Sequence, residues 1–189
     1  MTLLIIGLVL FLGIHSVSIV APAWRDAQLA ARGEAAWKGL YSAVSVVGFG
    51  LLVYGYGVAR QSPVVLYTPP AVLRHVALLL MLPVFPLLFA VYLPGRIKTA
   101  TKHPMLLAVK FWALAHFLAN GALADVLLFG SFLVWAVVDR ISIKRRPVRP
   151  VRGGAARPAN DLIAVLGGLA IYVGILMVAH HWLIGVSPL

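Results

Sequence analysis

The chain has 189 residues, of which 62% are hydrophobic and only 11% are charged, and it contains no cysteine. A soluble domain has about 45–50% apolar residues by a similar count, so this composition predicts an integral membrane protein without a separate soluble domain. The absence of cysteine excludes disulfides, iron–sulfur clusters and thiolate ligands to zinc or haem iron.

The formal net charge of +11 would suit a nucleic-acid-binding protein if the basic residues lay together on a folded surface. They lie instead in the connections between apolar stretches, where basic residues set orientation and meet anionic lipid headgroups. We therefore expect the lipid bilayer as a partner and expect no nucleic acid.

Six apolar stretches each approach the roughly 20 residues that cross a bilayer. They predict an all-α fold, a polytopic membrane helix bundle with about six transmembrane helices, in a single integral membrane domain over residues 1–189. No basic residue precedes the first stretch, so we expect it to be a retained helix and not a cleaved signal peptide. The stretches cover residues 3–22, 37–58, 72–93, 104–120, 123–138 and 162–183.

Several of these stretches carry local packing signals. The second is rich in glycine and other small residues, which predicts close approach to another helix, with an oligomer interface or a flat cofactor surface as alternatives. Pro83 and Pro86 predict a kink in the third, because proline removes a backbone hydrogen bond. Only residues 120–122 separate the fourth and fifth, so we expect these two to form a tight helical hairpin.

The connections indicate the orientation. The first, third and fifth hold most of the lysine and arginine, whereas the opposite side has only Arg60 and Arg74. The positive-inside rule then predicts that both termini face the non-cytoplasmic side, the periplasm or its equivalent. The fifth connection, residues 141–161, includes Pro147 and Pro150 and is predicted to be a linker along the headgroups, with a docking site for an acidic partner as the alternative.

His15 and His116 lie inside the first and fourth stretches, where polar side chains usually face a bundle interior. A neutral imidazole is the commonest protein ligand of a metal or a haem iron, so both are candidate ligands; a helix–helix hydrogen bond is the alternative. His103 is expected to be interfacial. Thirteen residues separate it from His116, about 220° of helical rotation, so these two do not readily serve one metal. Spacing alone leaves open which of them pairs with His15.

Two further polar residues belong to the same region. Lys110 is expected to extend toward the cytoplasmic face, with Asp139 or a haem propionate as alternative partners. Asn120 lies one turn beyond His116 on the same face, so we expect it to orient that imidazole.

The chain contains the segments Gly13-Ile14-His15-Ser16, Lys102-His103-Pro104, Leu114-Ala115-His116, Asn120-Gly121, Leu128-Phe129-Gly130-Ser131-Phe132 and Asp139-Arg140. Taken together, these motifs resemble the NnrU family of bacterial inner-membrane proteins, which are associated with nitrite and nitric oxide reduction. The same superfamily includes the plant 15-cis-zeta-carotene isomerase, a membrane enzyme that uses haem b. The resemblance implies that His15 and His116 match haem-ligating histidines, and that His103 matches a further motif histidine. An acidic residue commonly follows the Asn-Gly pair of the family; here Ala122 stands there and Asp125 is the next acid, so no role is carried over.

Three functions follow as expectations. The first is an NnrU-like protein that binds one haem b through His15 and His116, with Asn120 and Lys110 nearby. It would be accessory to denitrification, with nitric oxide as a candidate ligand and denitrification proteins as candidate partners. The second is a haem-dependent cis–trans isomerase of a carotenoid-like polyene lipid, and the third is a haem-free structural membrane protein. Whether the protein is an enzyme stays open at this point.

Overall fold

The computed structural model describes residues 1–146 and 153–189, and the regular secondary structure of these residues is helical. They form two compact units. Unit 1 comprises Met1–Thr68 and Gly121–Arg146, and unit 2 comprises Pro69–Asn120 and Pro147–Leu189. The all-α prediction is confirmed, while the single domain expected over residues 1–189 remains a prediction.

Each predicted stretch falls on helix, and five helical segments of the described chain are long and apolar enough to cross a membrane, as a multi-pass membrane protein requires. The remaining apolar helix, α6, is shorter, so the count of six spans stays a prediction. The helices are α1 (Thr2–Val20), α2 (Pro22–Ala59), α3 (Val72–Met81), α4 (Val84–Tyr92), α5 (Arg96–Thr101), α6 (Pro104–Ala119), α7 (Leu123–Ile143), α8 (Asn160–Gly174), the π-helical turn η1 (Ile175–Ala179) and α9 (His180–Ile184).

The first connection, between the apolar stretches 3–22 and 37–58, is largely helical, because α2 already begins at Pro22. Proline suits the first turn of a helix, and the alanines that follow are strong helix formers. Gly33 interrupts this helix with φ 79° and ψ 163°, a conformation that glycine alone adopts readily. The buried Trp37 meets the ring of Trp24 edge-on at 5.9 Å, and Arg25 lies 5.9 Å from the Trp37 centroid. Hydropathy detects apolar segments only, and the first part of α2 is helical although it is not apolar.

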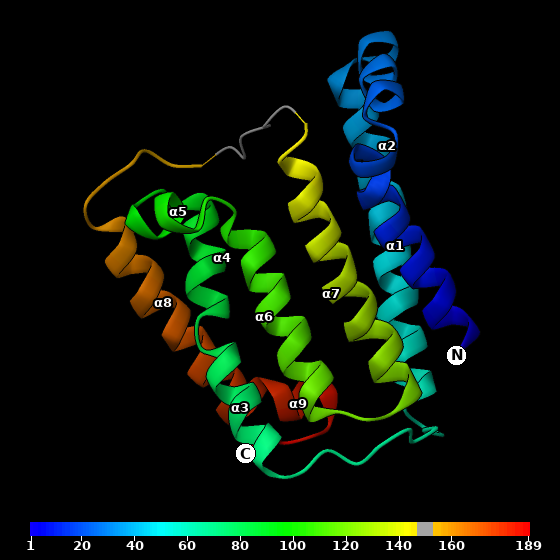
Figure 1. The fold of residues 1–189 in the computed structure, drawn as a ribbon, viewed down its shortest axis with the longest axis vertical. Helices are drawn as coiled ribbons and strands as arrows, with labels where there is room; N and C mark the ends of the chain where they lie inside the picture. The colour runs from blue at the N-terminus through cyan, green and yellow to red at the C-terminus, as the bar shows by residue number, and fades with distance from the viewer. Residues whose placement is uncertain (147–152) are drawn as a thin grey trace. The chain divides into compact units, whose positions relative to one another are not determined.

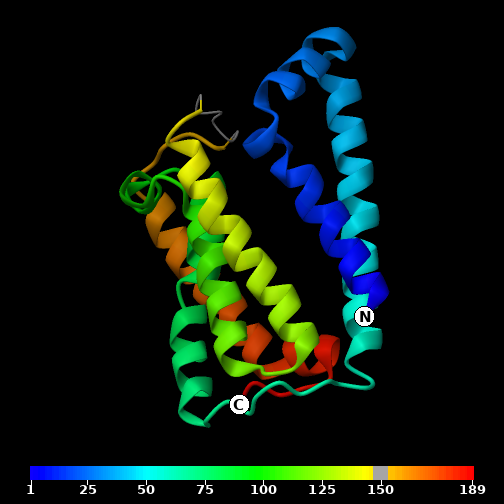
Figure 2. The ribbon, with the colours of Figure 1, turned by 45° about the vertical axis from the view of Figure 1, so that its right-hand side comes forward.

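In unit 1, glycines allow the backbones of α1 and α2 to touch, as Figures 1 and 2 show by the close course of the two ribbons. A Cβ added to Gly48 would lie 2.7 Å from the backbone nitrogen of Phe11, and one added to Gly55 would lie 2.6 Å from the carbonyl carbon of Leu3. The close packing predicted for the second apolar stretch is therefore confirmed. Only one face takes part, since a Cβ on Gly50 would meet no atom within 4 Å.

The other end of unit 1 is held by backbone pairing and by a buried carboxylate. Leu66 N–H donates to the Gly121 carbonyl at 2.9 Å, which joins the chain after α2 to the start of α7. Asp125, only 7% exposed, accepts hydrogen bonds from the Ala122 backbone N–H at 3.1 Å and from the Tyr56 hydroxyl at 2.6 Å. Tyr67 lies in the segment that follows α2. Its burial and the negative charge of Asp125 raise the pKa of its phenol. Asp125 thus caps α7 and ties it to α2.

This arrangement predicts an unequal effect of two similar substitutions on α2. Tyr56→Phe removes a donor from a buried carboxylate and is expected to lower the free energy of unfolding by about 1–2 kcal/mol. Tyr54→Phe is the matched control, because Tyr54 is 64% exposed and is expected to be nearly neutral. Thermal unfolding in detergent measures both. Combining Tyr56→Phe with Asp125→Ala is expected to cost no more than Asp125→Ala alone, and additive losses would contradict the pairing.

In unit 2, the predicted kink separates α3 from α4. Leu82 N–H donates to the carbonyl of Leu79, three residues earlier, at 3.3 Å, whereas an α-helix would use the carbonyl four residues earlier. The pattern changes here because the helix breaks at Pro83. The Leu78 carbonyl, which Leu82 would otherwise satisfy, accepts a hydrogen bond from the Tyr172 hydroxyl of α8 at 2.9 Å. The kink is confirmed, and a side chain from another helix compensates for it.

The start of α8 is bound to the connection between α4 and α5. Asn160, 4% exposed, donates to the Pro94 carbonyl at 2.8 Å, and Asp161 accepts from the backbone N–H groups of Arg96 and Ile97 at 2.7 and 3.1 Å. The end of the fifth connection is therefore anchored to unit 2, and its predicted course along the headgroups stays a prediction. Its central residues Pro147, Arg149, Pro150 and Arg152 lie outside the described residues.

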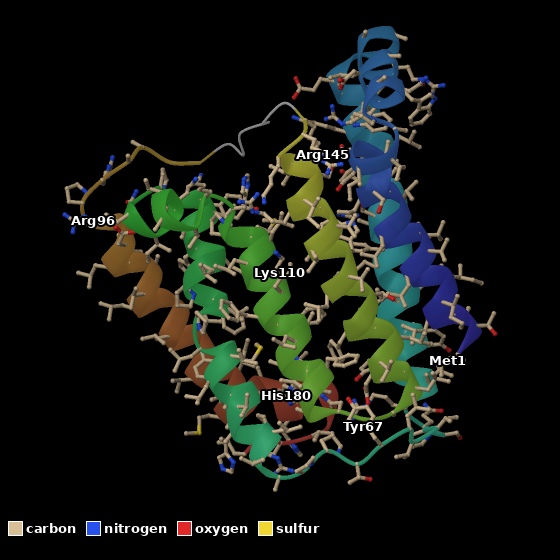
Figure 3. The ribbon with its side chains drawn as sticks, viewed as in Figure 1. Met1, Tyr67, Arg96, Lys110, Arg145 and His180 are labelled. Atoms are coloured by element: carbon tan, nitrogen blue, oxygen red, sulfur yellow. The ribbon has the colours of Figure 1, made fainter. Side chains whose placement is uncertain are left out.

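Each unit gathers basic residues at one end. In Figure 3, Arg145 lies at the end of unit 1 away from Met1, and Arg96 lies at the end of unit 2 away from His180. This segregation within each unit agrees with the positive-inside reasoning. The side of the membrane on which the termini lie stays a prediction.

Candidate functional site

His15 is half-buried on α1, and its ring is anchored to its own helix. The Nδ1 atom lies 2.6 Å from the backbone carbonyl oxygen of Phe11, four residues earlier. A carbonyl only accepts hydrogen bonds, so Nδ1 carries the proton, and Nε2 of the neutral ring holds the lone pair. Nε2 is thus the atom through which His15 can bind a metal.

Aromatic side chains from all three helices of unit 1 surround this imidazole. Phe11 stacks on it with ring centroids 4.2 Å apart, Tyr41 of α2 lies at 5.1 Å, and Trp135 of α7 meets it edge-on at 6.0 Å. Such contacts restrict rotation of the ring and keep its surroundings apolar. The position of Phe11 one turn before His15 is visible in the sequence, whereas Tyr41 and Trp135 are brought there only by folding.

His116 of unit 2 has the same local arrangement on α6. Its Nδ1 lies 2.9 Å from the Trp112 carbonyl oxygen, and the Trp112 ring is centred 5.6 Å from the imidazole. The same argument places the proton on Nδ1 and the lone pair on Nε2. Asn120 donates from Nδ2 to the backbone carbonyl of His116 at 2.8 Å, so it contacts this residue; its expected effect on the imidazole stays a prediction.

The other predicted site residues are distributed as follows. His103 is half-buried and is the residue from which α6 begins, before Pro104, as an interfacial position would be. Lys110 is half-buried midway along α6, where Figure 3 labels it. Asp139, in unit 1, forms an ion pair with Arg146. Within the described residues no group of three or more His, Cys, Asp or Glu side chains forms a candidate metal site.

His15 belongs to unit 1, whereas His103, Lys110, His116 and Asn120 belong to unit 2. The local geometry of each histidine is therefore described separately, and their joint ligation of one haem stays a prediction. Sequence reasoning missed the aromatic surroundings of His15. It also missed Asp125 and Tyr56, whose interaction joins residues far apart in the chain.

Comparison with known proteins gives one result. A protein-family model described as NnrU protein matches residues 3–188, which covers both units and all of these residues. No curated protein and no solved structure matches the chain.

Proposed function

Because this chain belongs to the NnrU family, we propose that it is an inner-membrane haem b protein accessory to nitrite and nitric oxide reduction. His15 and His116 are the proposed ligands of the haem iron. The observation that carries this proposal is the identical anchoring of both imidazoles through Nδ1 to a carbonyl four residues earlier.

This anchoring is the arrangement that a ligating histidine needs. Metal-bound histidines almost always donate their other ring N–H to a carbonyl, carboxylate or water, which fixes the tautomer and makes the ligand more basic. His15 and His116 both present the required tautomer without rearrangement. A histidine that only joined two helices would be expected to use its ring nitrogens toward the neighbouring helix.

The remaining residues fit the same group. With no cysteine in the chain, the common haem-iron ligands that remain are histidine, methionine and tyrosine. The rings of Phe11, Tyr41 and Trp135 give His15 surroundings that suit the apolar faces of a porphyrin. Lys110 is the proposed cation for a haem propionate. When bound, the haem supplies one-electron chemistry and, if one ligand is exchangeable, a site for nitric oxide.

The absorption spectrum of the detergent-purified protein, oxidised and then reduced with dithionite, tests this proposal. We expect a low-spin b-type spectrum with about one haem per chain, as two nitrogen ligands imply. Nitric oxide added to the reduced protein then separates two roles: an unchanged spectrum indicates electron transfer, and a changed one indicates a sensor or a catalyst. A protein that is colourless, and stays so after reconstitution with haem, would overturn the proposal.

A further inference from the structure

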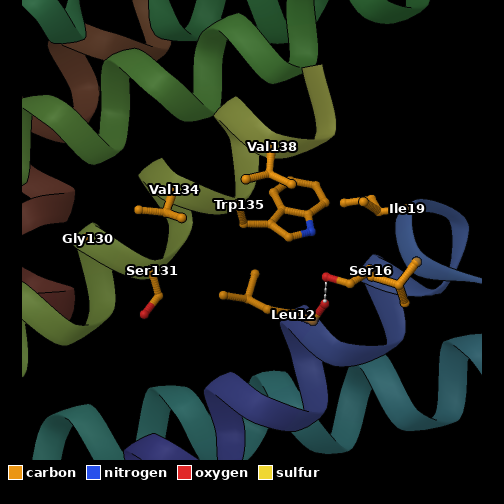
Figure 4. Close-up of a pocket in the computed structure, with 9 residues that line it drawn as sticks. Leu12, Ser16, Ile19, Gly130, Ser131, Val134, Trp135 and Val138 are labelled. Atoms are coloured by element: carbon orange, nitrogen blue, oxygen red, sulfur yellow. Dashed lines mark hydrogen bonds between the residues drawn. The ribbon is translucent and has the colours of Figure 1, made fainter. Parts of the chain in front are cut away.

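Unit 1 carries a groove between α1 and α7, with a volume of about 540 Å³. Figure 4 shows that its walls are mostly aliphatic, with Leu12 and Ile19 on α1 and Val134 and Val138 on α7. Val134 and Val138 are 63% and 43% exposed, so the groove opens outward. Both helices are long and apolar enough to cross the membrane, so we expect lipid around them.

One wall of the groove contains a hydrogen-bond donor without an acceptor. The indole Nε1 of Trp135 is buried, and none of the described residues accepts a hydrogen bond from it. In Figure 4 the nitrogen edge of this ring is turned toward Ser16 and Ile19 of the opposite wall. The Ser16 hydroxyl already donates to the Leu12 carbonyl at 2.7 Å, so the indole is the donor that an incoming oxygen atom would satisfy.

Basic residues lie just beyond the end of α7, the helix that forms one wall of the groove. Lys144 and Arg145 follow directly after Ile143, where α7 ends, and Val138 of the groove wall lies five residues before that end. Arg145 is exposed at this end of unit 1, as is its neighbour Lys144, whereas the nearby acid Asp139 is already paired with Arg146. This end of the groove therefore has an excess of positive charge.

We propose that this groove binds one anionic phospholipid from the leaflet at the basic end of unit 1. An acyl chain fills the aliphatic part, a glycerol ester carbonyl accepts the hydrogen bond of Trp135, and Lys144 and Arg145 attract the phosphate. Trp135 lies between Val134 and Val138 of the aliphatic wall, and the cations follow directly after α7, so one lipid can offer acyl carbons to the wall, a carbonyl to the indole and its phosphate to the cations. A neutral lipid such as a quinone would satisfy the indole but would leave the cations without a partner.

Native mass spectrometry of the full chain tests this proposal. The protein is equilibrated in detergent with equal amounts of phosphatidylglycerol, phosphatidylcholine and a ubiquinone. We expect the wild type to retain one phosphatidylglycerol in preference to the other two. Trp135→Phe is expected to lower this retention about threefold to tenfold through the lost hydrogen bond. Arg145→Gln is expected to lower retention of phosphatidylglycerol by a similar factor and to leave that of phosphatidylcholine unchanged.

Two substitutions away from the groove serve as controls. Trp182 is 81% exposed in α9 of unit 2, and Arg74 is exposed at the start of α3, so Trp182→Phe and Arg74→Gln are expected to retain lipid like the wild type. Equal retention of the three lipids, preference for the ubiquinone, or wild-type retention by Trp135→Phe would each overturn the proposal. If Trp135→Phe does not fold, Arg145→Gln still decides, because a surface substitution leaves the helices intact.

Discussion

Replacement of His15 or His116 by alanine is expected to abolish the low-spin b-type spectrum and to lower the haem content of the purified protein at least about tenfold. Each substitution removes one of the two proposed nitrogen ligands. Absorption spectra and haem content per chain measure the effect, and thermal unfolding shows whether each variant is folded. His103→Ala is expected to keep the spectrum, because His103 is the N-cap residue of α6 and lies thirteen residues before His116, which is in the last turn at the other end of the helix.

His75→Ala and His181→Ala are the matched controls, since both histidines are exposed, near helix ends of unit 2. Glycine variants of His15 and His116 separate ligation from packing. Imidazole added to the buffer is expected to restore the spectrum of a glycine variant if the side chain is a ligand. If His15 and His116 only connect helices, the alanine variants will unfold at lower temperature, and imidazole will restore no colour.

The second large effect concerns the contact between α1 and α2. Gly48→Leu is expected to lower the free energy of unfolding by at least about 3 kcal/mol, because even a Cβ at this position lies 2.7 Å from the backbone of Phe11. The two helices would have to move apart, which would break the contact between the rings of His15 on α1 and Tyr41 on α2. Unfolding in detergent measures the stability, and the haem content gives an independent reading of His15.

Gly50→Leu is the control for this prediction, because Gly50 lies two residues away on the same helix and a Cβ there meets no atom within 4 Å. We expect it to be nearly neutral. A Gly50 variant as unstable as the Gly48 variant would mean that the open face of α2 is also packed, as the oligomer interface considered from the sequence would require.

The comparison of these two glycines shows how far the sequence reaches. The abundance of glycine in the second apolar stretch predicts close helix packing, and the structure confirms it. Which glycines take part depends on the register of α1 against α2, and no local pattern contains that register. In the same way Pro83 predicts the kink between α3 and α4, but the sequence does not indicate that Tyr172 compensates for it.

The candidate site also combines features that the sequence indicates with features that only the fold provides. The histidines were found from their unusual position in apolar stretches, and their anchoring involves carbonyls only four residues away, within the same helix. The aromatic surroundings of His15 and the unpartnered indole of Trp135 depend on α2 and α7, which are distant in sequence. The sequence identified Asp125 only as the next acidic residue after Gly121. Its hydrogen bond with Tyr56 joins residues 69 positions apart, so no local pattern predicts it.

The sequence by itself therefore determined the helical membrane class, the approximate positions of the apolar helices, the proline kink and the choice of His15 and His116 as candidate ligands. Each of these depends on a residue and its neighbours in the sequence. The tertiary structure alone decided which glycines touch and which side chains surround His15. It also decided where Trp135 meets the groove between α1 and α7. These features depend on the register and packing of one helix against another, and a linear pattern does not specify that packing.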